Sequence, residues 1–137
     1  MKNTTRLKTL LAERRAITFP GAANAMFARV IEELGFEACY LTGAGIANMH
    51  LGAPDIGLTT LTEIANAVAA IADAVDLPLL VDADTGFGNA VNMTRTVKVL
   101  ERAGAAGIQI EDQVFPKKCG HFNGKEVIPL AEMVAKV

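Results

Sequence analysis

The chain has 137 residues, of which 51% are hydrophobic and 20% are charged, and this length supports one domain around one core. A formal net charge of -2 offers no basic face for nucleic acid or for an anionic membrane surface. No apolar run reaches the roughly 18 residues of a membrane-spanning helix, and charges interrupt the N-terminal stretch where a signal peptide would be apolar. We therefore expect a cytoplasmic protein without a nucleic-acid or membrane partner.

Hydrophobic periodicity divides the first half of the chain into alternating helices and strands. The predicted elements are a helix over 5–15, a strand over 16–19, a helix over 23–34, a strand over 37–41 and a loop from Thr42 through Asp55. The next helix is expected to begin at Thr60, because Thr60 and Glu63 have the spacing of a capping box. This pattern predicts two strand–helix units behind a short N-terminal helix.

The second half of the chain continues the alternation. The predicted elements are a buried strand from Leu79, a helix over 90–103 closed by Gly104, a strand over 107–112, a polar loop over 113–125 and a helix from Leu130. Short apolar strands that alternate with helices are typical of a parallel sheet. Four such units extrapolate to eight in roughly 250 to 270 residues, the usual size of a barrel. We therefore predict an α/β fold in which residues 1–137 are the N-terminal half of a single (β/α)8 TIM-type barrel domain.

Acidic residues gather at the predicted carboxyl ends of the strands. Asp82 and Asp84 end an apolar run, and residues two apart on a strand point to the same side, so their carboxylates should converge. Converging carboxylates repel each other unless a cation compensates, and Mg²⁺ prefers oxygen ligands. Asp55 and Glu111 also follow strands. Each acid alone is equally explained as a helix cap or a solvated loop residue, but the four together predict a Mg²⁺ site.

The loop after the fourth predicted strand carries further candidates. Lys117 and Lys118 precede Cys119, and neighbouring positive charge lowers the pKa of a thiol, so Cys119 is either a reactive thiol on a closing loop or a passive surface residue. The two lysines either face solvent or bind substrate carboxylates. A zinc site is disfavoured because the ligand spacing matches no familiar pattern. The residues that it would require are Cys39, His50, Cys119 and His121.

Five motifs, taken together, point to a known family. They are Tyr40-Leu41-Thr42-Gly43, Asp55, Val81-Asp82-Ala83-Asp84-Thr85-Gly86-Phe87-Gly88, Ile110-Glu111-Asp112 and Lys117-Lys118-Cys119-Gly120-His121. With them the chain resembles the isocitrate lyase and phosphoenolpyruvate mutase superfamily, most closely its 2-methylisocitrate lyase-like branch. The similarity covers nearly the whole chain, and the last motif is the most specific.

The resemblance implies a (β/α)8 barrel whose site is assigned as follows. Mg²⁺ would be held, largely through water, by Asp55, Asp82, Asp84 and Glu111. The 2-oxo acid part of the substrate would lie against Tyr40, Thr42, Gly43, Ala44 and Asp82. A gating loop would bring to the substrate the proton donor Cys119 together with Lys117, Gly120 and His121.

The activity implied by the resemblance is a Mg²⁺-dependent carbon–carbon lyase. Its substrate would be a 2-hydroxy di- or tricarboxylate similar to 2-methylisocitrate, cleaved to pyruvate or glyoxylate and a succinate-like acid. An oxaloacetate decarboxylase or a phosphoenolpyruvate-type phosphonomutase of the same family is the alternative, although such mutases usually lack the cysteine. An inactive half-barrel that only binds Mg²⁺ is a further alternative. The resemblance also implies a homo-oligomer, in particular a tetramer.

Overall fold

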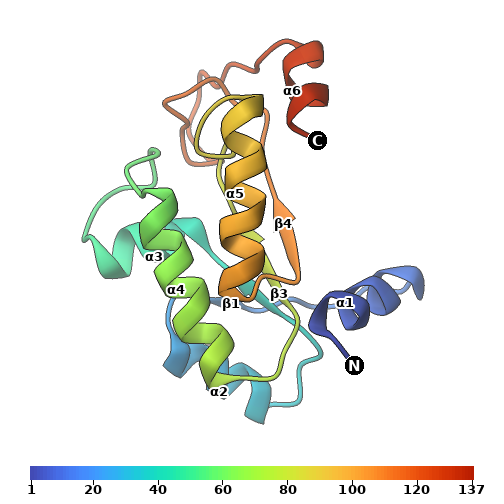
Figure 1. Cartoon of the computed structure of the whole chain (residues 1–137). Coiled ribbons are helices and arrows are strands. Elements are labelled where there is room, and N and C mark those ends of the chain that lie inside the picture. Colours follow the sequence, from blue (N-terminus) through green and yellow to red (C-terminus); the bar gives the residue numbers. More distant parts are fainter.

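The computed structural model describes residues 1–137 and contains one parallel sheet of four strands (Figure 1). The strands are β1 (Gly21–Ala22), β2 (Cys39–Leu41), β3 (Leu79–Asp82) and β4 (Gly107–Gln109). They lie in the order β1-β2-β3-β4, with Tyr40 opposite Leu80 and Leu80 opposite Gly107. Because the strands are parallel and consecutive, the loops that follow them all leave from the same edge of the sheet.

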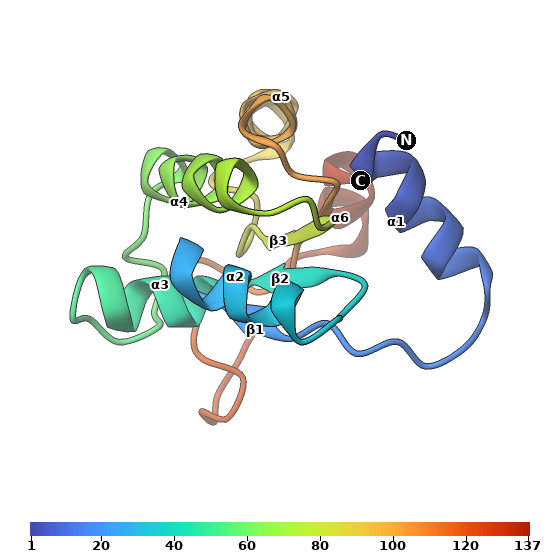
Figure 2. The same ribbon diagram turned by 90° about the horizontal axis from the view of Figure 1, so that it is seen from below.

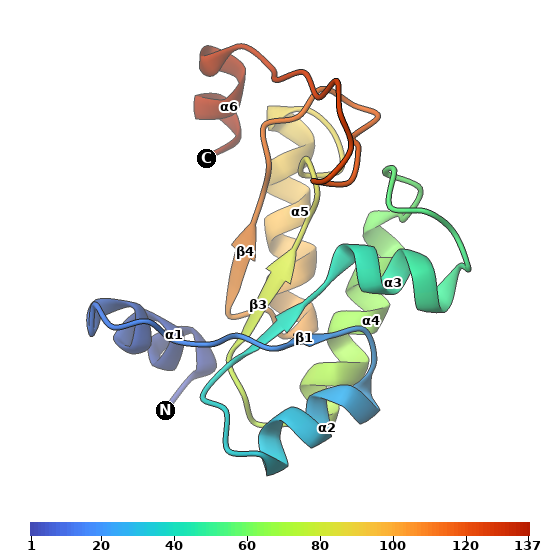
Figure 3. The ribbon, with the colours of Figure 1, turned by 180° about the vertical axis from the view of Figure 1, so that it is seen from behind.

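The helices are α1 (Asn3–Ala12), α2 (Ala25–Glu33), α3 (Gly43–His50), α4 (Leu61–Ala74), α5 (Ala90–Ala103) and α6 (Leu130–Lys136). Figure 2 shows α2, α4 and α5 arranged around one face of the sheet. Helix α4 lies between the other two and packs against both α2 and α5. Seen from behind, in Figure 3, the opposite face of the sheet carries no such layer. The architecture is therefore the predicted α/β arrangement of strand–helix units.

Alternate residues of β2 and β3 separate the two faces of the sheet. The fully buried positions, on the helix side, are Cys39, Leu41, Leu79 and Val81. The intervening positions Tyr40, Leu80 and Asp82 are only half-buried. Since burying one Leu or Val side chain contributes about 1.5–3 kcal/mol, the helix side supplies the hydrophobic core, and the other face can carry polar groups.

Helix α1 packs on the sheet through Leu7, which is buried. A Cβ at Gly107 would come within 2.7 Å of the Leu7 side chain and within 3.3 Å of Leu80. Gly107 therefore lets α1 approach β3 and β4 closely.

The strand predicted over 16–19 is wrong. That segment has no regular structure, and β1 begins at Gly21. Pairing with β2 starts at the Pro20 carbonyl, which accepts the Tyr40 N–H at 2.9 Å. Proline has no N–H to donate, which is tolerated at the edge of a sheet. The partner strand, rather than the apolar side chains before Pro20, decides where β1 lies.

The long loop predicted from Thr42 is also partly wrong, because it contains α3. The Thr42 side chain caps this helix by accepting the Gly45 N–H at 3.1 Å. Gly43 and Gly45 lie in its first turn, where glycine disfavours a helix, and they concealed it in the sequence.

Other local signals are confirmed. Thr60 and Glu63 form a capping box at the start of α4, and α5 ends at Gly104 in a left-handed conformation with φ of 115°. The fourth strand is shorter than predicted and ends at Gln109. None of the helices combines the length and the apolar composition that crossing a membrane requires.

The capping box predicts a measurable effect on stability. Thr60→Ala removes the acceptor for the Glu63 N–H and one partner of the Glu63 carboxylate, and should lower the free energy of unfolding by about 1 kcal/mol. Urea denaturation followed by circular dichroism measures it. Thr62→Ala, an exposed position in the same turn, is the control and should change stability by less than about 0.5 kcal/mol. Equal losses in both variants would contradict the assignment.

Candidate functional site

A small cavity of about 170 Å³ lies at the carboxyl ends of the strands. It is lined by Tyr40, Asp55, Asp82, Gln109, Ile110, Glu111, Lys117, Lys118 and Gly120. These residues belong to β2, β3 and β4, to the loop after α3, which carries Asp55, and to the loop after β4. This edge of a parallel sheet is where α/β proteins build their sites.

The Lys117 ammonium group joins acids from three different loops. Its Nζ lies 2.5 Å from Asp55 Oδ1, 2.7 Å from Asp84 Oδ1 and 3.9 Å from Glu111 Oε1. The Lys117 side chain is 6% exposed and Asp84 is 7% exposed, so water screens these contacts little. Lys117 is therefore the cation around which the loops after α3, β3 and β4 meet.

Burial and charge shift the pKa values of this cluster. Burial raises the pKa of Asp84, and the Lys117 ammonium opposes this effect. Burial likewise raises the pKa of Glu111, opposed by a hydrogen bond from Gln113. For Lys117, burial acts against the charged form, but the contacts with Asp55 and Asp84 outweigh it and raise its pKa. Lys117 therefore stays charged at neutral pH.

Asp82 and Asp84 converge, but not by the predicted alternation along a strand. β3 ends at Asp82, and Asp84 lies beyond it with φ of 47°. The Asp84 N–H donates to Asp82 Oδ1 at 3.1 Å, and the Gly43 N–H donates to Asp82 Oδ2 at 3.2 Å. A Cβ at Gly43 would lie 3.0 Å from Asp82 Oδ2 and 3.5 Å from Asp84 Oδ1. The glycine thus leaves room for both carboxylates.

Tyr40 stands beside these acids on the half-buried face of β2. Burial, together with the neighbouring Asp82 carboxylate, raises the pKa of its phenol well above the ordinary range. The hydroxyl therefore keeps its proton at neutral pH and can donate it in a hydrogen bond.

Two buried oxygen atoms in the cluster differ in how they are paired: Asp84 Oδ1 lies 2.7 Å from the Lys117 ammonium, whereas Glu111 Oε1 has no hydrogen-bond partner and lies 3.9 Å from it. Four carboxylates around one lysine leave excess negative charge, and an oxygen-only donor set suits a hard cation such as Mg²⁺. No three Asp, Glu, His or Cys side chains are arranged to ligate an ion directly. The residues fit an ion that keeps most of its water.

The loop that carries Cys119 is held by its own lysines. Lys118 Nζ donates to the Gly124 carbonyl at 2.7 Å, and Lys125 Nζ donates to the carbonyls of Gly120 and Phe122. Within the loop, Cys119 Sγ lies 3.2 Å from His121 Nδ1. The thiol and the imidazole therefore form a pair, but neither side chain lines the cavity.

The structure brings together part of the predicted site. The predicted residues that line the cavity are Tyr40, Asp55, Asp82, Glu111, Lys117 and Gly120, and Asp84 and Gly43 contact this group. Those that do not line it are Thr42, Ala44, Cys119 and His121. Two further residues were not predicted from the sequence: Thr59, which donates to Asp84 Oδ2 at 3.4 Å, and Gln113, which donates to Glu111 Oε2. A buried Thr or Gln carries no pattern that would reveal such a partner.

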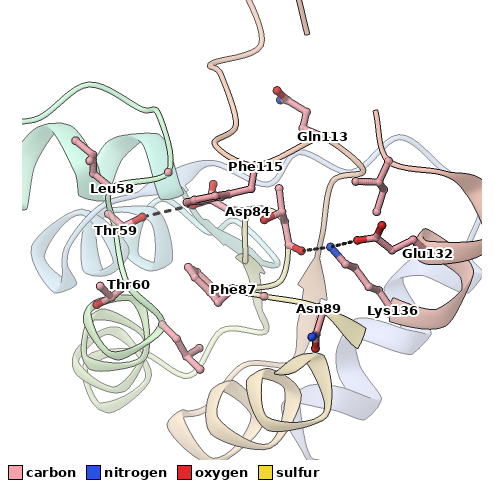
Figure 4. Close-up of a pocket in the computed structure, with 15 residues that line it drawn as sticks. Leu58, Thr59, Thr60, Asp84, Phe87, Asn89, Gln113, Phe115, Glu132 and Lys136 are labelled. Carbon is pink, nitrogen blue, oxygen red and sulfur yellow. Dashed lines mark hydrogen bonds and ion pairs between the residues drawn. The ribbon is translucent and has the colours of Figure 1, made fainter. Parts of the chain in front are cut away.

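A larger cavity, of about 600 Å³, adjoins the other side of Asp84 (Figure 4). The rings of Phe87 and Phe115 lie in its wall. Its polar groups are already paired: the Thr59 hydroxyl points to Asp84, and Lys136 Nζ donates to the Thr85 carbonyl at 3.2 Å. The smaller cavity, with the unpaired Glu111 Oε1, is therefore the better candidate for chemistry.

The fold and the cavity define a class of protein, the TIM-barrel type with an acid-rich site at the carboxyl ends of its strands. The sequence model of the family described as phosphoenolpyruvate phosphomutase matches residues 7–137. The chain belongs to this family, part of the PEP mutase/isocitrate lyase superfamily.

Two curated relatives are lyases. The chain is 50% identical to 2,3-dimethylmalate lyase of Eubacterium barkeri over 137 residues, which is 100% of this chain and 47% of the relative. It is 52% identical to 2-methylisocitrate lyase of Aeropyrum pernix over 131 residues, 96% of this chain and 42% of the relative. The chain thus spans less than half the length of these relatives.

Solved structures share the fold. A crystal structure of 2,3-dimethylmalate lyase, described as a PEP mutase/isocitrate lyase superfamily member, matches with a TM-score of 0.92 at 35% identity, over 99% of this chain and 46% of that one. Phosphonopyruvate hydrolase in complex with oxalate and Mg²⁺ matches with a TM-score of 0.86 at 33% identity, over 99% and 46% of the two chains.

Removing the central cation should destabilise the chain. Lys117→Met leaves the carboxylates of Asp55, Asp84 and Glu111 without their ammonium partner. It should lower the free energy of unfolding by about 3 kcal/mol at pH 8 in EDTA. Without the ammonium, the pKa of Asp84 rises further, so the folded variant binds protons that the unfolded chain releases. The loss should therefore shrink as pH falls toward 5. Lys118→Met, at an exposed position, is the control; a comparable loss there would contradict the role of Lys117.

The two thiols should differ in reactivity. Burial raises the pKa of Cys39 to about 11, although a backbone hydrogen bond involving Ala22 opposes it, so the thiolate fraction at pH 8 is on the order of one in a thousand. Iodoacetamide should therefore modify one thiol per folded chain, at Cys119, and two in urea. Peptide mass mapping identifies the site. Early modification of Cys39 under native conditions would show that β2 is not buried as described.

Proposed function

We propose that the whole protein is a Mg²⁺-dependent carbon–carbon lyase, and that residues 1–137 are the N-terminal half of its single barrel domain. Its substrate is a 2-hydroxy di- or tricarboxylate, which it cleaves to pyruvate or glyoxylate and a succinate-like acid. The observation that carries the proposal is the convergence of Asp55, Asp82 and Glu111 on one cavity, with Asp84 joined to them through Lys117. The identity of about half of the residues with two lyases supports it.

Asp82 and Asp84, with Asp55 and Glu111 beside them, would hold the Mg²⁺ ion. Glu111 Oε1, which is buried without a hydrogen-bond partner, favours a further cation, and Mg²⁺ retains several waters in such sites. When bound, Mg²⁺ supplies Lewis-acid stabilisation for the negative charge that develops on the oxygens of a 2-hydroxy acid. The related phosphonopyruvate hydrolase with oxalate and Mg²⁺ is consistent with this assignment.

Tyr40 and the start of α3 would bind the 2-oxo acid part of the ligand. The Tyr40 phenol keeps its proton and can donate to a ligand oxygen. Thr42 caps α3, and the first backbone N–H groups of a helix have no partner within it. The Gly43 N–H is bound to Asp82 and the Gly45 N–H to Thr42, so the Ala44 N–H is the group that would bind a ligand carboxylate at this end of the helix.

Cys119 would supply a proton on the loop that closes over the cavity. A base takes the proton of the substrate hydroxyl, and the alkoxide electron pair forms the C=O bond of the 2-oxo acid as the C–C bond breaks. The electron pair of that C–C bond stays with the departing acid as an enediolate, which Cys119 Sγ–H protonates at carbon. His121 Nδ1, 3.2 Å from Sγ, is placed to exchange that proton. Movement of the loop would bring Cys119 and His121 to the cavity, where Lys117 and Gly120 already lie.

The second candidate is an oxaloacetate decarboxylase or a phosphoenolpyruvate-type phosphonomutase of the same family. The similarity to phosphonopyruvate hydrolase favours an activity of this kind, whereas Cys119 favours the lyase. A cytoplasmic location and assembly into a homo-oligomer, in particular a tetramer, remain predictions.

The proposal predicts a pattern of activities. With Mg²⁺, the protein extended to the length of its relatives should release a 2-oxo acid from 2-methylisocitrate or 2,3-dimethylmalate. EDTA should abolish this activity, and Asp84→Ala and Cys119→Ser should each lower kcat at least about a hundredfold. Lactate dehydrogenase, which reduces pyruvate and glyoxylate, reports the product.

Asp112→Asn serves as the matched control, because Asp112 is exposed beside Glu111 and should leave kcat unchanged. Release from oxaloacetate alone, unaffected by Cys119→Ser, would replace the lyase by a decarboxylase. No release from any of these acids by the extended protein would refute the proposed function.

A further inference from the structure

Gln113 is a buried polar residue to which the proposed reaction assigns no role. It is 8% exposed, and its side-chain amide makes three hydrogen bonds. Nε2 donates to Glu111 Oε2 at 2.8 Å and to the Lys118 carbonyl at 2.9 Å, while Oε1 accepts the Lys118 N–H at 3.0 Å. Both ends of the amide are therefore engaged, and two of its bonds hold one residue of the loop.

The residues on either side of Gln113 hold the other end of the same loop through their backbones. Gln113 forms an antiparallel bridge with Val127, flanked by a bond from the Val114 N–H to the Glu126 carbonyl at 2.8 Å. The Ile128 N–H donates to the Asp112 carbonyl on the other side, also at 2.8 Å. The Gln113 side chain thus fixes the chain at Lys118, whereas the backbone bonds of its neighbours Asp112 and Val114 fix it at 126–128. The segment between these two points carries Cys119.

These bonds also orient two groups of the cavity. Gln113 occupies one oxygen of Glu111 and leaves the other, Oε1, buried without a hydrogen-bond partner and 3.9 Å from Lys117 Nζ. Fixing the Lys118 backbone fixes the adjacent Lys117. The Gln113 amide therefore fixes the position of the Glu111 carboxylate relative to the Lys117 ammonium.

We propose that Gln113 is a positioning residue of this site: it directs Glu111 Oε1 and Lys117 into the cavity, and its side chain anchors the loop over 118–127 at Lys118. An amide suits this role because it donates and accepts at once. A carboxylate at 113 keeps one of the three bonds and repels Glu111. The orienting part rests on the proposed function, whereas the anchoring of the loop stands apart from it.

Limited trypsin digestion of the 137-residue chain tests the anchoring. Gln113→Met removes all three bonds and should raise cleavage after Lys118 about tenfold relative to cleavage after Arg15, the internal reference in the exposed segment behind α1. Thr59→Val is the matched control, since it removes a buried hydrogen bond to Asp84 outside this loop, and the ratio should stay unchanged. If Gln113→Met does not fold, Gln113→Glu, which keeps the bond from the Lys118 N–H, should give a smaller increase.

An unchanged cleavage ratio in a folded Gln113 variant, or an equal increase in Thr59→Val, would overturn the anchoring role. Calorimetric titration with Mg²⁺ tests the orienting role: Gln113→Met should bind Mg²⁺ about tenfold more weakly than the parent chain. Equal Mg²⁺ affinities would overturn it. If the parent chain itself binds no Mg²⁺, the metal assignment of the proposed function fails, and the orienting role of Gln113 fails with it. The cleavage ratio then still decides whether Gln113 anchors the loop.

Discussion

The arrangement of the site depends on one buried ammonium group. Lys117 draws Asp55, Asp84 and Glu111 together from three loops, and each of these acids would otherwise face like charge. Buried ion pairs gain little net stability, because both partners lose their hydration. The cluster therefore matters chiefly for geometry, since it fixes where the loops lie relative to one another.

The parallel sheet makes this cluster possible. Consecutive parallel strands deliver their loops to one edge, so residues 55, 84 and 117 come together although they are far apart in the chain. Two local backbone features then set the distances between these side chains. Gly43 leaves space for two carboxylates, and the left-handed backbone at Asp84 turns its side chain back toward Asp82. The polar edge is compatible with a stable fold because the hydrophobic core lies on the helix side of the strands.

The sequence predicted those features whose causes are local. The capping box of Thr60 and the end of α5 at Gly104 depend on a few neighbouring residues, and both are confirmed. The position of β1 depends on pairing with β2, and α3 begins with glycines, so neither could be predicted from local preference. The acids were found because carboxylates after apolar strands are conspicuous. Gln113 was missed because only the folded loop brings Lys118 back to its amide.

The charge of the cavity limits what these residues can bind by themselves. A di- or tricarboxylate substrate needs positive charge, and Lys117 is already paired with Asp55 and Asp84. Lys118 is the other lysine at the cavity, but its ammonium is bound to the Gly124 carbonyl. Under the proposed function, the substrate would therefore find its counter-charges in Mg²⁺, in the Ala44 N–H and in residues of the part of the barrel that these 137 residues do not include. The relatives are more than twice as long as this chain. This is consistent with the proposal that residues 1–137 supply the metal ligands and the proton donor, whereas other residues recognise the remaining carboxylates.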